Sequence, residues 1–387
     1  MRVCFFSHSS GRGGAEEVLL ETVECLQEKQ IECCVFMPGD DGLGDDLRRL
    51  GVTFHKLPYW PWMWLGPQSI WNQTEATARN LLLSLPAIIQ LRNWRPDIVY
   101  SNTMTICTGA IVARLIHRPH VWHLHELGYE DHGLMFQYGA PFSYKMIDAL
   151  STTCIAVSQR TADHFAKYID PSKLKVLYQS VHRSARWPET VPNQTRSETV
   201  PPRIQALRCV LVGRVSQGKR QEDAVRAMAI LKRNGISVEL LIVGRSNPGY
   251  RERLDAIVKE HNLQDRVIFA GAVVDRVPFV QSADIVLMCS TCEAFGRVTV
   301  EGLLAGKAVI AANSGANSEL IQEDSNGLLY KMGDIEGLAD KIRWLSEHPE
   351  ISARIGKKAK SQAEAFFTKE RFSKEIVSLL DSVVSPR

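Results

Sequence analysis

Long apolar runs are absent from this sequence of 387 residues. No stretch approaches the ~18 residues of a membrane-spanning helix. The opening Met1–Ser7 also reaches polar residues before an apolar segment of signal-peptide length is complete. We therefore expect a cytoplasmic protein, and leave peripheral contact at the inner face of the membrane as an open alternative.

A strong excess of basic charge is absent as well. The formal net charge is +3, with 46 basic and 43 acidic residues, and the two signs nearly balance over residues 1–185. Nucleic acid is a polyanion that proteins bind through clustered Lys and Arg side chains. We therefore expect no nucleic-acid partner.

The cysteine pattern argues against a disulfide framework. Nine cysteines, an odd number, are scattered through apolar segments, as expected of buried thiols in a reducing compartment. Cys289 and Cys292 form one C-x-x-C pair, but a zinc site needs further ligands that the sequence does not supply nearby. We interpret this pair as structural.

Several catalytic motifs are also missing. The glycine turn Gly11–Glu16 has Glu16 where a dinucleotide fingerprint has its third glycine, and no Walker loop, H-E-x-x-H or G-x-S-x-G is present. Asp-x-Asp is absent too, so a carboxylate-held Mg²⁺ on a diphosphate has no evident ligands. These absences argue against dinucleotide oxidoreductases and α/β-hydrolases.

Strands and helices alternate along the chain, which indicates an α/β protein with two doubly wound, Rossmann-like domains. Residues 1–184 form the first predicted domain, 185–203 a polar linker and 204–368 the second, with a final helix at 369–387 that packs back on the first. The clearest predicted elements are strands Arg2–Phe6, Ile31–Met37, Asp97–Ser101, His120–His123, Ile155–Ser158, Leu207–Val212, Glu239–Val243, Val267–Phe269, Ile285–Met288 and Ala308–Ala311, and helices Asn80–Trp94, Thr161–Tyr168, Glu222–Arg233 and Lys369–Val384.

Glu293 and Glu301 stand eight residues apart, on either side of a Phe-Gly turn that opens an apolar helical pattern. At about 1.5 Å per residue, a helix would separate them by ~12 Å, too far for a shared proton. They suit two clamps on one elongated ligand whose anionic middle lies at the helix N-terminus. Taken alone, two solvent-exposed glutamates are the simpler interpretation.

Other motifs follow strands, where doubly wound sheets bind ligands. His123 and His125 point to one side of a strand end, and packing competes there with function. Arg214 and Lys219 flank a loop that opens a helix and would suit a diphosphate, although they could equally be solvated surface charges. The aromatic segment Tyr59–Leu65 suits packing, a membrane interface or stacking on acceptor sugars.

Together these motifs resemble the retaining glycosyltransferases of family 4, which have the GT-B fold of two facing Rossmann-like domains with a cleft between them. The resemblance covers nearly the whole chain and is most specific in Glu293–Gly306. The residues that carry it are Gly13-Gly14-Ala15-Glu16, His125-Glu126, Gly213-Arg214 with Lys219, Val243-Gly244, Glu293 to Glu301, and Gly315 with Glu319.

The resemblance implies a role for each candidate residue. The implied catalytic residues are His125 near the reacting carbon or the sugar 6-hydroxyl, Glu293 on the donor sugar, and Arg214 and Lys219 on the diphosphate. The implied donor-binding residues are Glu301 on the ribose, Gly13 and Gly14 beneath the diphosphate and sugar, Phe295 and the Gly296, Arg297 and Val298 amides at the phosphates, and Arg245 and Val273 near the base.

The implied reaction needs no metal or other cofactor, because fixed cations can stabilise the negative charge that develops on the departing diphosphate. The donor would be a nucleotide-sugar, most often a UDP-sugar such as UDP-glucose in this family. The acceptor would be a saccharide or a lipid-linked saccharide in polysaccharide or glycolipid biosynthesis. A GDP-sugar donor and a non-catalytic nucleotide-sugar-binding subunit are the alternatives. Arg220 and Arg297 depart from the family pattern by adding positive charge.

Overall fold

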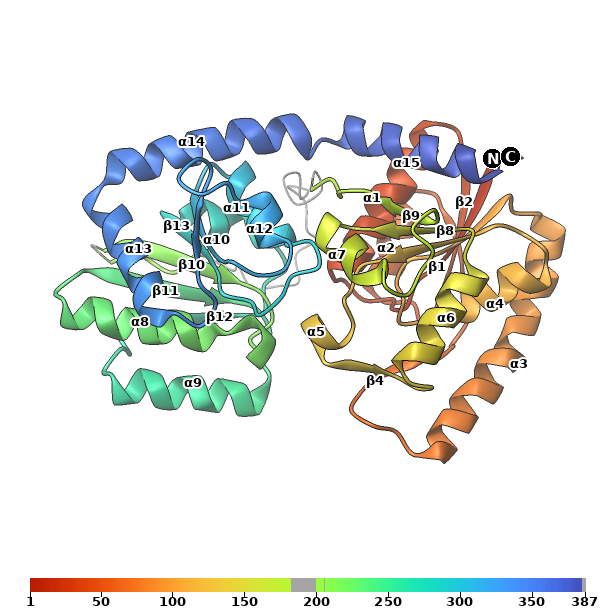
Figure 1. Ribbon diagram of the computed structural model, residues 1–387, viewed down its shortest axis with the longest axis horizontal. Helices are drawn as coiled ribbons and strands as arrows, with labels where there is room; N and C mark the ends of the chain where they lie inside the picture. The colour runs from red at the N-terminus through yellow and green to blue at the C-terminus, as the bar shows by residue number, and fades with distance from the viewer. Residues whose placement is uncertain (182–199, 205, 385–387) are drawn as a thin grey trace. The chain divides into compact units, whose positions relative to one another are not determined.

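The computed structural model describes residues 1–181, 200–204 and 206–384. The predicted linker, 185–203, lies mostly outside the described residues. The chain divides into two compact units, one of residues 1–180 with 368–387 and one of residues 181–367. Figure 1 shows that each unit has a sheet with helices on both faces.

Unit 1 is built on a parallel sheet with strand order β3-β2-β1-β5-β6-β8-β9, and β4 and β7 form a separate antiparallel pair. Its strands are β1 (Arg2–Phe6), β2 (Glu32–Met37), β3 (Thr53–Lys56), β4 (Met63–Leu65), β5 (Ile98–Ser101), β6 (His120–Leu124), β7 (Leu134–Phe136), β8 (Thr153–Ala156) and β9 (Leu174–Val176). Its helices are α1 (Gly14–Glu28), α2 (Gly42–Arg49), α3 (Ile70–Trp94), α4 (Thr108–Leu115), α5 (Tyr129–His132), α6 (Ala140–Leu150), α7 (Gln159–Phe165) and α15 (Lys369–Val384).

Alternating residues of β1 show how this sheet is covered on both faces. Val3 and Phe5 pack with α1 and α15, whereas Cys4 and Phe6 pack with α3 and α4. All four side chains are fully buried, as expected of a parallel strand between two helical layers. Helix α15 also joins unit 1 through Lys369, whose ammonium group contacts Glu24 and Glu28 of α1 at 3.1 and 2.5 Å.

Unit 2 repeats the architecture with the parallel order β12-β11-β10-β13-β14-β15. Its strands are β10 (Leu207–Val212), β11 (Val238–Val243), β12 (Val267–Gly271), β13 (Ile285–Met288), β14 (Ala308–Ala312) and β15 (Leu328–Tyr330). Its helices are η1 (Gln217–Lys219, a 3₁₀ turn), α8 (Gln221–Arg233), α9 (Pro248–Glu260), α10 (Val277–Ser282), α11 (Arg297–Leu304), α12 (Asn317–Leu320), α13 (Ile335–Glu347) and α14 (Pro349–Phe366).

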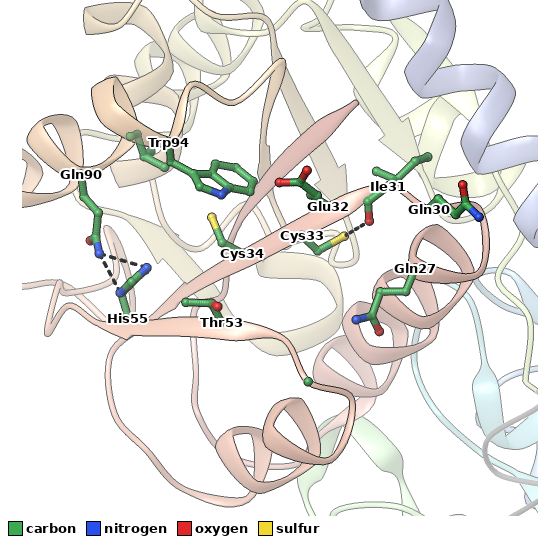
Figure 2. A pocket seen from close by; sticks show the side chains of 12 residues that line it. Gln27, Gln30, Ile31, Glu32, Cys33, Cys34, Thr53, His55, Gln90 and Trp94 are labelled. Atoms are coloured by element: carbon green, nitrogen blue, oxygen red, sulfur yellow. Dashed lines mark hydrogen bonds between the residues drawn. The ribbon is translucent and has the colours of Figure 1, made fainter.

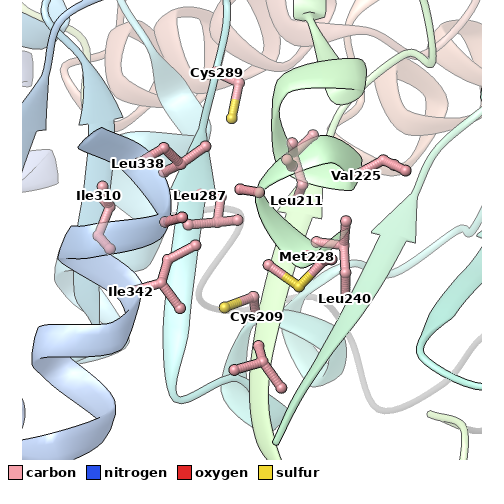
Figure 3. Close-up of a cluster of buried hydrophobic side chains, with 14 of the residues drawn as sticks. Cys209, Leu211, Val225, Met228, Leu240, Leu287, Cys289, Ile310, Leu338 and Ile342 are labelled. Atoms are coloured by element: carbon pink, nitrogen blue, oxygen red, sulfur yellow. The ribbon is translucent and has the colours of Figure 1, made fainter. Parts of the chain in front are cut away.

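One face of the unit 2 sheet packs on α8 and α13 (Figure 3). Strand residues Leu211 and Leu287 meet Met228 of α8 and Leu338 of α13, and all four are nearly or completely buried. Burial of each such side chain contributes about 1.5–3 kcal/mol to folding. This packing fixes the sheet, and with it the loops that leave the carboxyl ends of its strands.

The structure confirms the predicted α/β class and two Rossmann-like halves. Several short elements were not predicted, namely β3, β4, β7, β9 and β15. The strand predicted at Ile155–Ser158 overlaps β8, and the unpredicted β9 follows it and pairs with it. Helix α3 begins ten residues before the predicted Asn80.

The segment Tyr59–Leu65 is divided between core and surface, since Tyr59, Trp62 and Met63 are buried whereas Leu65 is 73% exposed. Tyr59 and Trp62 are 3% and 1% exposed. The Tyr59 hydroxyl donates to the carbonyl oxygens of Ser7 and Phe36, and the Trp62 indole N–H donates to the Met104 carbonyl oxygen at 2.6 Å. The packing interpretation therefore holds for these two rings.

Candidate functional site

In unit 2, the loops after β10 and β11 lie directly against each other. Gly213 and Gly244 have φ values of +149° and +146°, and a Cβ atom on Gly244 would lie 2.0 Å from the Gly213 carbonyl oxygen. The Val215 N–H donates to the Arg245 carbonyl oxygen at 2.9 Å. Glycine is required for this approach, which places the exposed Arg214 and Arg245 on neighbouring loops at the carboxyl ends of the strands.

Lys219 and Glu293 are in direct contact. The Lys219 Nζ lies 2.5 Å from the Glu293 Oε1, and the side chains are 25% and 13% exposed. The loops that carry them are also joined by the backbone, because the Thr291 N–H donates to the Gly218 carbonyl oxygen at 2.9 Å. The residues that the resemblance assigns to the diphosphate and to the sugar are therefore neighbours in space.

Helix α11 begins at this same edge of the sheet. Gly296 is its N-cap, with φ +87°, and α11 runs from Arg297 to Leu304. The first turn of a helix presents backbone N–H groups and positive dipole, which favour an anionic group. The predicted phosphate-binding amides of Gly296, Arg297 and Val298 are therefore placed at a helix N-terminus.

Gly315 holds the Glu293 loop in place from the other side. Its φ is +56°, and a Cβ atom there would lie 2.4 Å from the Glu293 backbone N and 2.5 Å from its O. The Ala316 N–H donates to the Glu293 carbonyl oxygen at 2.8 Å. The orientation of Glu293 therefore depends on the absence of a side chain at position 315.

Glu301 lies about one turn after Arg297, the first residue of α11. It is paired with Arg276. The Arg276 Nε and Nη2 contact the Glu301 Oε2 and Oε1 at 2.7 and 2.5 Å. The Glu301 side chain is 6% exposed, and a cavity of about 110 Å³ beside it is lined also by Val277, Val280 and Leu304. A bidentate arginine pair fixes the plane of a carboxylate, so Glu301 is held rigidly beside this cavity.

Phe295 and Val273 are placed differently from each other. The Phe295 ring is 4% exposed and meets the Phe367 ring at 6.0 Å between centroids. Phe295 can therefore offer a ligand its backbone and little of its ring. Val273 is half-buried in the loop after β12, three residues before Arg276.

In unit 1, the predicted Gly13 and Gly14 stand at the start of α1, with Gly13 as its N-cap. A Cβ atom on Gly13 would lie 2.7 Å from the Glu16 Oε2. The Glu16 Oε1 lies 3.2 Å from the His8 Nδ1. Burial lowers the pKa of His8, and the Glu16 charge opposes that shift.

His125 follows β6, and its ring packs against that of a second histidine at an interplanar angle of 43°. The His123 and His125 ring centroids are 3.9 Å apart, and the His125 Nδ1 lies 3.1 Å from the Gln179 Nε2. The His123 Nδ1 is bonded to the Tyr100 hydroxyl at 2.7 Å, and burial lowers the pKa of His123 to about 3. A neutral His123 therefore supports His125 at neutral pH.

Glu126 is a buried carboxyl group beside His125. Burial raises its pKa well above the usual value, and the neighbouring Asp131 charge raises it further. A carboxyl group in such a setting holds its proton and can donate a hydrogen bond. Asp131 itself accepts a hydrogen bond from the Leu127 N–H at 2.7 Å.

The predicted residues thus fall into two groups, each within one unit. Unit 1 holds Gly13, Gly14 and His125. Unit 2 holds the rest, in the loops that follow its strands and in α11, with Lys219 touching Glu293. These residues are Arg214, Lys219, Arg245, Val273, Glu293, Phe295, Gly296, Arg297, Val298 and Glu301.

Sequence reasoning missed the partners of these residues. Arg276 was not singled out, although the loop after a strand of a doubly wound sheet was a signal that could have found it. His8 follows β1 and carried the same signal. Gln179 carried none, because it is remote in sequence from the His125 that it contacts.

A larger cavity of about 610 Å³ lies away from all of these residues (Figure 2). It opens where β2 and β3 begin, and its lining includes Cys34, His55, Gln90 and Trp94. The Gln90 amide is hydrogen-bonded to the His55 ring. Since ligands of doubly wound sheets bind at the carboxyl ends of strands, this cavity is separate from the candidate site.

Over the part of the chain that the structure describes, no three His, Cys, Asp or Glu side chains are grouped so as to hold a metal ion. The expectation of metal-independent transfer stays a prediction. None of the described helices is long and apolar enough to cross a membrane. All nine cysteines are free thiols in this structure.

Comparison with known proteins agrees with this arrangement. Residues 12–184 match the family Glycosyltransferase Family 4, and residues 205–362 match Glycosyl transferases group 1. Among relatives, the putative glycosyltransferase EpsD of Bacillus subtilis is 25% identical over 290 residues, covering 70% of this chain and 72% of EpsD. Spore coat protein SA of Bacillus subtilis is 24% identical over 96% of both chains.

Among solved structures, Anabaena HepE in complex with UDP superposes with a TM-score of 0.80 at 23% identity, covering 99% of this chain and 100% of HepE. A likeness of this kind establishes the fold. The predicted GT-B fold is therefore confirmed.

The fold and the two family matches define the class of protein: this chain is a glycosyltransferase of the GT-B type. Its first unit carries a Glycosyltransferase Family 4 domain and its second a Glycosyl transferases group 1 domain.

Proposed function

We propose that this protein is a retaining hexosyltransferase that takes a hexose from a UDP-sugar, such as UDP-glucose, and transfers it to a saccharide or lipid-linked acceptor in polysaccharide or glycolipid biosynthesis. It would work in the cytoplasm. The observation that carries the proposal is the Lys219–Glu293 contact beside the N-terminus of α11. A cation, a carboxylate and a helix N-terminus meet there, which suits the sugar–diphosphate end of such a donor.

Three features of unit 2 support the placement of the donor. Lys219 and Arg214 would offset the diphosphate charge, aided by the first-turn amides of α11. Glu293 would accept hydrogen bonds from sugar hydroxyls. Glu301, held by Arg276 beside the small cavity, would accept from ribose hydroxyls, with Arg245 and Val273 towards the base.

The relatives give the donor and pathway their support. HepE was solved with UDP and with UDP-glucose, and other relatives include glycogen synthase of Mycobacterium tuberculosis and lipopolysaccharide core glycosyltransferase LpsD of Rhizobium meliloti. These names describe those proteins. The HepE complexes support a UDP-sugar donor for this chain, and the other two relatives support a saccharide acceptor.

The proposed reaction breaks the bond between the anomeric carbon and the diphosphate oxygen and forms a bond to an acceptor oxygen on the same face of the sugar. The departing diphosphate oxygen takes the acceptor proton. Fixed cations stabilise the charge that develops on the diphosphate. His125, packed against neutral His123, would lie by the reacting sugar, and no metal ion is required.

A panel of nucleotide-sugars tests the proposal. The full chain is incubated with UDP-, GDP- and ADP-sugars, and its melting temperature and the release of nucleoside diphosphate are measured. We expect UDP and a UDP-sugar to raise the melting temperature and the UDP-sugar to be cleaved slowly. If GDP-sugars alone stabilise the chain, the donor is a GDP-sugar and the UDP assignment is wrong. If a nucleotide-sugar binds but is not cleaved, with or without saccharide acceptors, the chain is a non-catalytic subunit.

A further inference from the structure

Helix α3 presents an apolar outer face. The inner face packs into unit 1 through residues that include Ala87, Ile88 and Leu91. Six large apolar side chains of α3 are instead exposed, by 51–81%, and these are Ile70, Trp71, Leu81, Leu82, Leu85 and Ile89. An exposed apolar patch of this size on a globular protein usually marks an interaction site.

This outer face is broad in the second half of the helix. From Leu81 to Ile89 it extends ~12 Å along the helix axis, and the exposed Thr74 and Glu75 separate it from Ile70 and Trp71. At 100° per residue, Leu81 and Pro86 bound an apolar arc of roughly 140° in the middle of the helix. A coiled-coil partner helix needs only a narrow a/d stripe, whereas a helix lying in a lipid surface buries a wide face.

Charge on α3 is sparse, with Glu75, Arg79 and Arg92 as the charged residues of Ile70–Trp94. Between residues 76 and 91 the sequence has one charged residue, Arg79, whose guanidinium lies over the Trp60 ring at 5.0 Å. Glu75 lies before that segment, and Arg92 and Arg95 follow it. The apolar middle thus carries almost no charge that contact with hydrocarbon would desolvate.

The rim near the C-terminal end of α3 is basic. Arg92 and Arg95 are exposed there, and Arg114 and Arg118 are exposed at the end of α4, which packs beside α3. Leu115, also at the end of α4, is 49% exposed. Figure 1 shows α3 and α4 as neighbouring helices of unit 1. Four guanidinium groups beside an apolar face are complementary to anionic lipid headgroups.

We propose that the outer face of α3 docks on an anionic lipid bilayer, with the helix parallel to the membrane plane and the four arginines at the headgroups. This assigns membrane contact to α3, while the Tyr59 and Trp62 rings of the aromatic segment stay in the core. The proposal goes beyond the proposed function and does not depend on it, since docking needs no nucleotide.

Vesicle co-sedimentation of the full chain tests the docking. The probes are vesicles of phosphatidylcholine alone and of phosphatidylcholine with 30% phosphatidylglycerol, at physiological salt. We expect partitioning onto the anionic vesicles and little onto the neutral ones. Leu82→Gln/Leu85→Gln should weaken it by at least about tenfold, because two leucines would no longer be buried in lipid. The control Met332→Gln removes a 44% exposed side chain from unit 2 and should change nothing.

The arginine rim is tested separately. Arg114→Gln/Arg118→Gln should lower partitioning onto anionic vesicles by about fivefold per arginine and leave neutral vesicles unaffected. Unchanged melting temperature and UDP binding in these variants would show that the donor unit is intact. The proposal is overturned if the wild-type chain ignores both vesicles, or if the leucine variant partitions as the wild type does. A dimer that the leucine variant abolishes, without vesicle binding, would assign this face to a second copy of the chain.

Discussion

Arg276 and Glu301 form a two-point ion pair in which each carboxylate oxygen accepts from one guanidinium nitrogen, at 2.5 and 2.7 Å. The pair joins the loop after β12 to helix α11. It fixes the carboxylate that the proposed function places on the donor ribose. Arg276 is therefore a positioning residue for Glu301.

Arg276→Gln should weaken UDP binding by about 1–3 kcal/mol, since it removes the charged partner of a buried carboxylate. Binding of 2′,3′-dideoxy-UDP, which has no ribose hydroxyls to offer Glu301, should fall much less. Calorimetric titration of both ligands measures the difference. The matched control is Arg253→Gln, which breaks the exposed pair with Glu222. Equal losses of affinity for the two ligands would contradict the assignment of Glu301 to the ribose hydroxyls.

Lys219→Ala should weaken UDP binding by ~1.5–3 kcal/mol, the scale of a hydrogen bond to a charged group. Lys341 offers a matched control, because it makes an ion pair with Glu323 in the same unit and its side chain is 29% exposed against 25% for Lys219. Lys341→Ala should leave the affinity unchanged. If Lys219→Ala also leaves it unchanged, the assignment of Lys219 to the diphosphate is wrong.

Gly315→Ala should both destabilise unit 2 and slow donor cleavage. The new Cβ would collide with the Glu293 backbone at 2.4 Å, in addition to the strain of φ +56°. Gly333→Ala is the control: its φ is +82°, but its Cβ would meet only the flexible end of Arg220 at 3.4 Å. We expect Gly333→Ala to cost about 1–2 kcal/mol in stability with normal cleavage. Normal cleavage by Gly315→Ala would show that the Glu293 loop tolerates displacement.

Stability should fall with acidification because His123 is buried as a neutral ring. Its folded pKa, lowered to about 3, lies below the unfolded value near 6.5, so between these pH values the unfolded chain binds a proton that the folded chain does not. His123→Gln should therefore reduce the slope of unfolding free energy against pH, between pH 6 and 4, by about 1.4 kcal/mol per pH unit. Tyr100→Phe removes the partner of His123 but keeps the ring, so it should keep the slope. An unchanged slope in His123→Gln would contradict the buried neutral ring.

Elements with strong hydrophobic patterns were predictable from the sequence. Strands β10 and β13 and helix α15 occupy the predicted residues because their apolar runs or helical periodicity are unbroken. The three-residue strands β4, β7, β9 and β15 carry too short a pattern to recognise. The start of α3 was missed because its first turns are mostly polar and its apolar residues point outward, against the usual pattern of a surface helix.

The sequence was sufficient to predict the individual residues of the candidate site. Glu293 and Glu301 could be recognised by their spacing beside a Phe-Gly turn, and Lys219 by its place in a loop after a strand. Their contacts were not predictable, since Lys219 and Glu293 are 74 residues apart in sequence and Arg276 and Glu301 are 25 apart. Only the fold brings such pairs together.

The stereochemistry of donor cleavage tests the central proposal most directly. Proton NMR follows the first sugar released when the full chain cleaves an α-linked UDP-hexose, before the free sugar mutarotates. If the protein is a retaining transferase, the wild type should release the α-anomer. Lys219→Ala should release no sugar. Initial release of the β-anomer, or no release from any nucleotide-sugar with any saccharide acceptor, would contradict the proposal.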